Sequence, residues 1–185
     1  PIAGYEEPTT LELAILEGGV PALLSVDYNW WMLFIGYQPG PMGVTSAFGC
    51  LLGAFYLIVP GAGSWRIMAG SAVGLVSPVT LLTITFPESD VFSIPWYWHA
   101  VLGGWAFGTV FLATDPTAAA TTRTGRWVFG LLVGVLTILV RLTNPAYFEG
   151  VVFAILLASI FAPLCDYFVV ERNIARRRAY LERRS

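Results

Sequence analysis

Long apolar stretches, separated by short polar segments, dominate this chain of 185 residues. A helix needs roughly 17–25 apolar residues to cross the hydrocarbon core of a bilayer, and several stretches approach that length. The Gly61–Ser64 segment between two of them has the composition of a tight turn and suits antiparallel neighbours. The pattern predicts five transmembrane helices, over about Val44–Pro60, Trp65–Phe86, Trp98–Thr114, Trp127–Val140 and Gly150–Val170.

Composition supports a membrane protein. Only 12% of the residues are charged, whereas soluble domains carry about 25%, and the mean hydropathy is +0.69. We therefore predict an all-α integral membrane protein. Because its fourth helix is short for a straight crossing, we expect Arg141 and Leu142 to extend it by snorkelling outward.

The positive charges predict an orientation. The chain has no Lys, and all of its Arg residues except Arg141 fall on one side of the predicted helices. The positive-inside rule makes that side cytoplasmic. Since the number of crossings is odd, the C-terminus is predicted to be cytoplasmic and the N-terminus to lie outside.

Four regions follow from this pattern. Residues 1–28, rich in Glu, Thr, Pro and Gly, are predicted to form an outside-facing extension rather than a core element. Residues 29–43 are apolar and aromatic but too short to span, which favours an interfacial or re-entrant segment. Residues 44–170 form the five-helix membrane domain, and residues 171–185 form a basic cytoplasmic tail. That tail is either a solvated topology anchor or a contact to anionic headgroups.

Polar groups near the membrane are candidates for function. Asp166 lies within the last predicted span, where an ionisable residue is a functional candidate unless it is hydrated or paired, for example with Arg172. The Asp115-Pro116 and Asn144-Pro145 breaks either free backbone carbonyls for a cation or form plain turns.

Other chemistry is less well supported. Cys50 and Cys165 have neither CxxC spacing nor a neighbouring His, which argues against a metal site built by this chain alone. His99 follows an aromatic run and is interpreted as a hydrogen-bonded residue of the interfacial belt. There is no phosphate loop and no dinucleotide fingerprint, and nothing indicates nucleic-acid binding. Gly104 with Gly108, and Gly130 with Gly134, have the four-residue spacing that lets helices approach closely.

Several motifs together resemble a known family, in order and with similar spacing. They occur at residues 92–99, 102–108, 113–116, 125–127, 144–150, 161–166 and 169–174, and include Phe-Ser-Ile-Pro-Trp-Tyr-Trp-His and Asn-Pro-Ala-Tyr-Phe-Glu-Gly. They resemble the C-terminal half of the NqrB subunit of the Na+-translocating NADH:quinone oxidoreductase. The RnfD subunit of the Rnf complex is related but typically lacks the Asn-Pro-Ala-Tyr form.

The resemblance implies a multi-pass protein of the bacterial inner membrane, within a complex that passes electrons through flavins and couples this to cation movement. It implies one half of a two-repeat helical bundle. The other half is then missing from this chain, or a separate chain, or absent from a reduced paralogue. We expect other membrane subunits, quinone and lipid as partners.

The family carries FMN on a Thr through a phosphoester, and that Thr corresponds to Thr9. The implied cofactors are therefore covalent FMN and, as a second flavin, riboflavin. The surrounding motif departs from the family at Ala3, Glu6 and Pro8, and Glu6 and Glu7 would repel a flavin phosphate. Thr10 and Thr45 are alternative attachment positions.

Two carboxylates are candidates for an ion pathway. The resemblance aligns Asp166 with an acidic position implicated in cation uptake, and Glu149 is the second carboxylate at the membrane boundary. Oxygen ligands of this kind suit Na+ and a proton equally.

The leading hypothesis is a flavin-bearing, cation-coupled redox subunit. An accessory or scaffold subunit without flavin is the alternative. A channel or solute transporter ranks last, because the helices offer mostly Gly, Thr and Ser as a polar lining.

Overall fold

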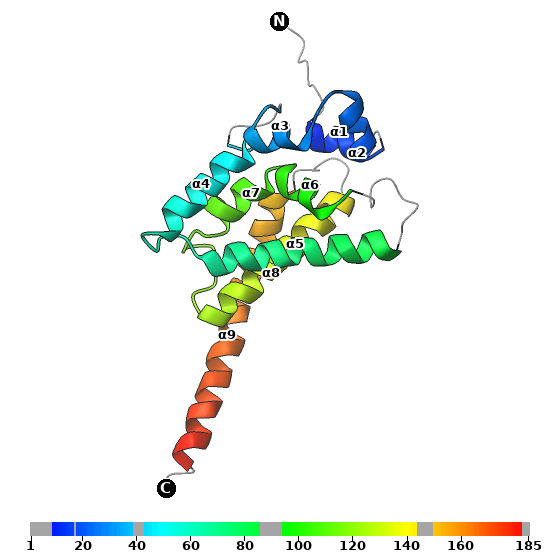
Figure 1. Ribbon diagram of the computed structural model, residues 1–185. Helices are drawn as coiled ribbons and strands as arrows, with labels where there is room; N and C mark the ends of the chain where they lie inside the picture. The colour runs from blue at the N-terminus through cyan, green and yellow to red at the C-terminus, as the bar shows by residue number, and fades with distance from the viewer. Residues whose placement is uncertain (1–8, 17, 39–42, 86–93, 144–149, 183–185) are drawn as a thin grey trace, which may run out of the picture.

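The structure is a computed structural model that describes residues 9–16, 18–38, 43–85, 94–143 and 150–182. This described part is helical and contains no strand, which confirms the all-α membrane class. Its elements are α1 (Thr10–Leu16), α2 (Val20–Ser25), α3 (Trp30–Ile35), α4 (Ala47–Ile58), α5 (Trp65–Thr85), α6 (Trp96–Val101), α7 (Trp105–Phe107), the π-helical turn η1 (Gly108–Leu112), α8 (Arg123–Thr143) and α9 (Val151–Glu182) (Figure 1).

Three helices in the described residues are long and apolar enough to cross a membrane. They are α5, α8 and α9, which correspond to the second, fourth and fifth predicted spans. At 21 residues, α8 is longer than predicted and needs no snorkelling residue to complete it. The first predicted span is represented by α4, whose helix has only 12 residues.

Glycines bring α5 and α8 close together. A Cβ on Gly70 would lie 2.8 Å from the carbonyl oxygen of Trp127, and one on Gly74 would meet that of Leu131. Conversely, a Cβ on Gly130 or Gly134 would meet the backbone of α5. This reciprocal contact confirms the predicted packing role of Gly130 and Gly134.

Small residues also set the contact between α8 and α9. Ala154, Ala158 and Ala162 are buried along one face of α9 at four-residue spacing, which permits close approach. The C-terminal half of α9 then leaves the bundle and extends clear of the other described elements (Figure 1). The predicted fifth span and the start of the predicted tail are therefore one continuous helix.

The third predicted span, Trp98–Thr114, is not one helix. Gly103 and Gly104 adopt φ angles of +66° and +68°, which break the chain between α6 and α7. These left-handed angles suit glycine because it has no Cβ. Gly104 therefore turns the chain instead of serving the helix packing that its spacing with Gly108 predicts. The chain continues as η1, where the Ala113 amide donates to the Gly108 carbonyl at 2.8 Å.

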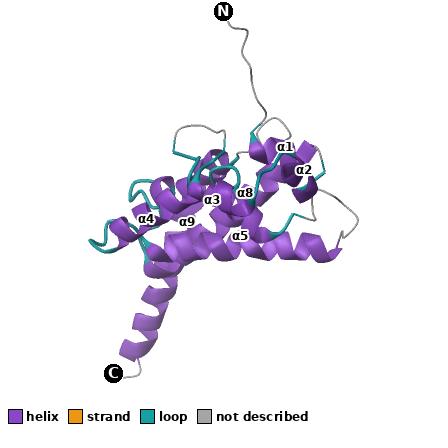
Figure 2. Cartoon of the chain, turned by 45° about the horizontal axis from the view of Figure 1, so that its top comes forward, coloured by secondary structure: helices purple, strands orange, loops and turns teal. Residues whose placement is uncertain are grey.

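The N-terminal segment packs on the membrane domain. Leu11 and Leu23 are fully buried in one hydrophobic cluster with Trp98 and Leu102 of the broken span. The helices α1, α2 and α3 lie on the side of the bundle where α6 and α7 lie (Figure 1), and the turned view shows that the described elements are helices joined by loops (Figure 2). The described part of residues 1–28 is thus a core element, contrary to the extension that its polar composition predicts.

Helix α3, within the predicted interfacial segment 29–43, is attached to the same region. The indole Nε1 of Trp30 donates to the carbonyl oxygen of Tyr97 at 3.1 Å. Its ring stacks on Phe34 with centroids 5.1 Å apart. Only six residues long, α3 forms a short aromatic helix and not a span.

Candidate functional site

Asp166 is held by the loop that precedes α8. Its Oδ2 accepts from the amide and the hydroxyl of Thr121, at 2.7 and 2.8 Å. Its Oδ1 accepts from the amide and the hydroxyl of Thr122, at 3.0 and 2.6 Å. Within the described residues, the carboxylate is thus bound by these two threonines and not by Arg172.

The same contact organises the start of α8. The Thr122 hydroxyl oxygen accepts from the Gly125 amide at 3.0 Å, as an N-cap residue does. The helix dipole favours a carboxylate at this end. A Cβ on Gly125 would lie 2.5 Å from Asp166 Oδ1, so glycine leaves the space that the carboxylate occupies.

Arg141 forms a second polar centre, which is buried, at the opposite end of α8. Its side chain is 2% exposed. Nη1 donates to the His99 carbonyl oxygen at 3.0 Å, and Nη2 donates to those of Leu102 and Gly103 at 2.8 and 3.1 Å. The expectation that Arg141 snorkels outward is therefore wrong, because the broken span supplies carbonyl oxygens that bind the guanidinium inside the protein.

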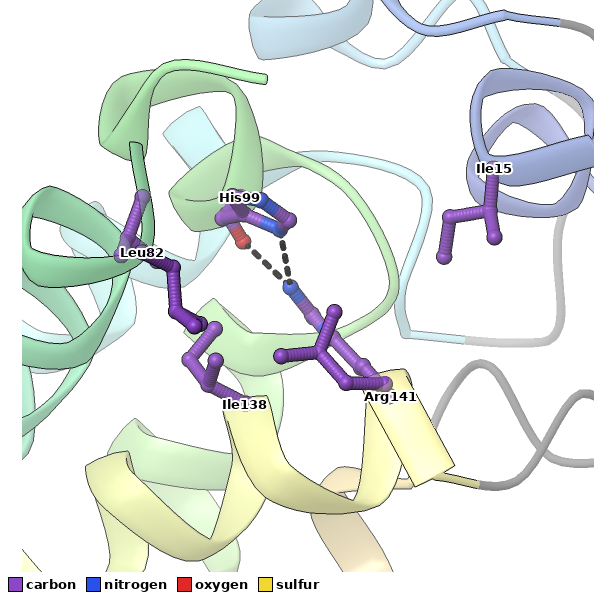
Figure 3. A pocket seen from close by; sticks show the side chains of 7 residues that line it. Ile15, Leu82, His99, Ile138 and Arg141 are labelled. Atoms are coloured by element: carbon purple, nitrogen blue, oxygen red, sulfur yellow. Dashed lines mark hydrogen bonds between the residues drawn. The ribbon is translucent and has the colours of Figure 1, made fainter. Parts of the chain in front are cut away.

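His99 belongs to this centre. Its ring is buried, and Nδ1 lies 3.4 Å from Arg141 Nη1 (Figure 3). The predicted belt residue is therefore inside the fold, although it is hydrogen-bonded as expected.

A small cavity lies beside these two residues. It is lined by Ile15, Leu82, Ile138 and neighbouring apolar side chains (Figure 3). Its volume of about 10 Å³ holds about one water molecule, so this interior has no room for an isoalloxazine ring.

The predicted flavin tether is close in sequence to this centre. The Thr9 carbonyl accepts from the Leu13 amide at 2.9 Å, and Thr9 Oγ1 accepts from the Glu12 amide at 3.3 Å, so Thr9 caps α1. Two residues later, Leu11 packs at the bend: a Cβ on Gly103 would meet both the Leu11 side chain and the Arg141 guanidinium. Thr9 is half-buried.

The alternative attachment positions differ in their surroundings. The Thr10 side chain is 3% exposed, and its hydroxyl donates to Gln38 Oε1 at 2.8 Å. Gln38 in turn donates to the carbonyl of Thr45 at 2.9 Å. This network ties the N-terminal helices to the segment before α4, and it makes Thr10 a buried structural residue.

The other sequence-predicted positions are distributed as follows. Asp115 forms a turn in which its carboxylate accepts from the Thr117 amide at 3.0 Å, and this hydrogen bond lowers the pKa of Asp115. Its carbonyl accepts from Ala118 and Ala119, as in a plain turn. Cys50 is buried and Cys165 half-buried, and both are free thiols. Glu149, with the Asn144-Pro145 break, lies outside the described residues, as do Glu6 and Glu7.

The two centres contain groups that the sequence patterns do not single out. Thr121 and Thr122 are such groups, although two hydroxyl residues directly before a helix are a common capping signal. Arg141 is singled out by its charge, but its inward direction is not predicted, because an arginine at the end of an apolar run can turn inward to a nearby chain break as well as outward. The Gly103-Gly104 pair is the signal for that break.

These features define a class of protein: an all-α membrane protein whose long helices are tied to a broken helix by a buried arginine, and to a loop by a hydrogen-bonded aspartate. Residues 3–175 match the model of the NQR2, RnfD, RnfE family, and the chain belongs to that family. The resemblance inferred from the motifs is thus confirmed.

Curated relatives are similar over nearly the whole chain. The B subunit of the Na(+)-translocating NADH-quinone reductase of Chromohalobacter salexigens is 47% identical over 175 residues, covering 94% of this chain and 42% of the relative. Those of Azotobacter vinelandii and Pseudomonas aeruginosa are 44% and 45% identical, each covering 96% of this chain and 44% of the relative. The chain spans less than half the length of these relatives.

Proposed function

We propose that this chain is a membrane component of a cation-coupled NADH:quinone redox complex, in which it carries electrons through a flavin. The identity to the B subunits of Na(+)-translocating NADH-quinone reductases supports this proposal. The proposal includes other membrane subunits and quinone as partners, and a location in the bacterial inner membrane with the N-terminus outside.

One observation carries the flavin part of the proposal: the Thr9 segment docks on the Arg141 centre instead of extending away from it. Leu11, two residues from Thr9, is fully buried there. A group attached to Thr9 would therefore be held against the broken span. An attached FMN would supply reversible one- and two-electron chemistry.

The residues around Thr9 are compatible with a phosphoester. The cap that Thr9 Oγ1 makes to the Glu12 amide uses an oxygen lone pair, which an ester oxygen retains. Because the neighbouring cavity holds about one water molecule, the flavin ring would lie outside that cavity. Arg141 would then not contact the flavin. It would hold the bend between α6 and α7, on which α1 packs, in place.

Flavin attachment is tested by denaturing electrophoresis of the complex, in-gel flavin fluorescence and peptide mass determination. We expect fluorescence in the band of this chain, loss of it in Thr9→Ala, and retention of it in the matched variant Thr10→Ala. Equal fluorescence in wild type and Thr9→Ala would reject Thr9 as the tether.

We further propose that Asp166 and Glu149 serve the ion pathway. The position of Asp166 supports this proposal, because a carboxylate within a candidate membrane span is a candidate for function. Its four hydrogen bonds fix its position at the N-terminal end of α8 and occupy the roughly four lone-pair sites of the carboxylate, so a cation would bind there by replacing one of the threonine donors.

The test separates the charge of Asp166 from its hydrogen bonds. Asp166→Asn removes the charge, whereas Thr122→Val removes a hydroxyl that binds the carboxylate. For a cation ligand, we expect Asp166→Asn to raise the cation concentration for half-maximal activity about tenfold, which is about 1.4 kcal/mol. We expect Thr122→Val to change it less than about twofold. Equal shifts in the two variants would assign Asp166 a structural role only.

An accessory subunit without flavin is the second candidate. The observation that favours it is the way all four hydrogen bonds of Asp166 connect α9 to the α8 loop, as a structural anchor would. This candidate predicts stable assembly of the complex with no flavin on this chain, and a Thr9→Ala complex with unchanged activity.

A further inference from the structure

A hollow of about 290 Å³ opens at the end of the bundle where α8 begins. It lies between the turn that joins α4 to α5, the loop that follows η1, and the first turn of α8. Polar side chains from all three elements line it, namely Ser64, Thr114, Thr121 and Arg126. It is separate from the small cavity at Arg141 and plays no part in the proposed flavin attachment.

Ser64 is an unsatisfied polar group in this hollow. The residue is 9% exposed, and its hydroxyl oxygen has no hydrogen-bond partner among the described residues. Its backbone carbonyl accepts from the Ile67 amide at 3.0 Å, so Ser64 is the capping residue directly before the first residue of α5. Because buried hydroxyls are nearly always hydrogen-bonded in native proteins, this one points to a ligand in the hollow.

The electrostatics of the hollow favour an anion. The Arg126 Nε donates to the Ala120 carbonyl at 3.3 Å, which leaves the terminal guanidinium nitrogens for a ligand. The N-terminus of α5 adds the positive end of a helix dipole. The carboxylate of Asp166 lies beside this rim, and its oxygens already accept from Thr121 and Thr122.

Residues next in sequence to the lining of the hollow resemble a membrane interface. Trp65 and Trp127 form an edge-to-face pair with centroids 5.7 Å apart, and both are partly exposed. Ile58, the last residue of α4, and Val59, which follows it, are exposed as well. Tryptophan pairs of this kind lie at headgroup level, so an anion in the hollow would have apolar surface next to it that acyl chains can cover.

We propose that this hollow binds the phosphate of an anionic phospholipid. Arg126 pairs with the phosphate, and the Ser64 hydroxyl donates to one of its oxygens. The acyl chains lie along the exposed end of α4. This inference concerns a lipid site and stands whether or not the chain carries flavin.

Native mass spectrometry of the detergent-solubilised full chain tests the site, with phosphatidylglycerol, phosphatidylcholine and inorganic phosphate as separate probes. The variants are Arg126→Gln and Ser64→Ala. Arg172→Gln is the matched control, because it removes the same charge from an exposed position on α9.

We expect phosphatidylglycerol to bind more tightly than phosphatidylcholine. One arginine near the membrane surface contributes about fivefold in affinity, and we expect Arg126→Gln to lose about that factor. Ser64→Ala should lose about twofold to tenfold, as the loss of a typical hydrogen bond does, with Arg172→Gln nearly unchanged.

Two results would overturn the proposal. If Arg126→Gln and Arg172→Gln weaken phosphatidylglycerol binding equally, the lipid responds to net charge and not to the hollow. If inorganic phosphate binds with the same dependence on Arg126 while phosphatidylglycerol does not, the hollow holds a soluble anion.

Discussion

At the scale of single residues, Arg141 and the break in the third predicted span stabilise one another. A broken helix leaves backbone carbonyls without intrahelical donors. The guanidinium supplies donors to three of them, at 2.8–3.1 Å. A buried charge is costly unless it is hydrogen-bonded, so neither feature is stable in the membrane domain without the other.

We therefore expect Arg141→Met to destabilise the chain strongly. The variant keeps most of the side-chain length but leaves the three carbonyls of the bend without their donor, at a total cost of about 3–5 kcal/mol. This corresponds to a loss of roughly 6–20 °C in Tm. Tryptophan fluorescence during thermal unfolding in detergent measures it, with Arg172→Met as the exposed control. A Tm unchanged from wild type would contradict the role assigned to Arg141.

At the scale of elements, the α5 and α8 pair depends on the absence of side chains at its centre. A Cβ on Gly134 would lie 2.6 Å from the Gly74 carbonyl carbon and 2.7 Å from the Leu75 amide nitrogen. Both neighbours are backbone atoms, which cannot move aside as a flexible side chain can. The helices would have to separate.

Gly134→Ala is accordingly expected to cost about 1–3 kcal/mol, as overpacking does in a close-packed interior. The matched control is Gly49→Ala in α4, where a Cβ would make ordinary contacts at 3.5 Å and beyond. Thermal unfolding of the two variants in the same detergent provides the comparison. Equal Tm values for both would show that the close approach of the helices contributes little.

The long helices are predictable from the sequence, and the departures from them have physical causes. Helices α5, α8 and α9 follow from hydropathy because the bilayer requires continuous apolar length. The packing of the N-terminal helices does not follow from hydropathy, because the apolar stripe of Leu11 and Ala14 lies on a helix of only seven residues. A stripe so short is easily taken for part of a polar loop.

The same contrast applies to the candidate sites. Asp166 can be singled out because carboxylates within spans are rare. Its donors cannot, since Thr121 lies 45 residues away in sequence and meets it only through the packing of α8 on α9. Distant contacts of this kind follow from the fold and not from a local motif.

At the scale of the whole molecule, the arginine distribution predicts which end of the bundle faces the cytoplasm. In a Cys50→Ala, Cys165→Ala background, we expect Arg176→Cys to react with a membrane-impermeant maleimide in inside-out vesicles only. Thr143→Cys, at the C-terminal end of α8, should react in right-side-out vesicles only. Labelling of both positions from one side would contradict the orientation.

The length of α9 has a mechanical consequence. Its 32 residues extend about 48 Å at the helical rise, against about 30 Å for the hydrocarbon core. The helix that packs through Ala154 and Ala158 therefore continues beyond the bundle (Figure 1), and Arg176 to Arg178 are exposed in its C-terminal part. A force that a partner applies to those arginines would therefore be transmitted along α9 to the hydrogen bonds between Asp166 and the loop before α8.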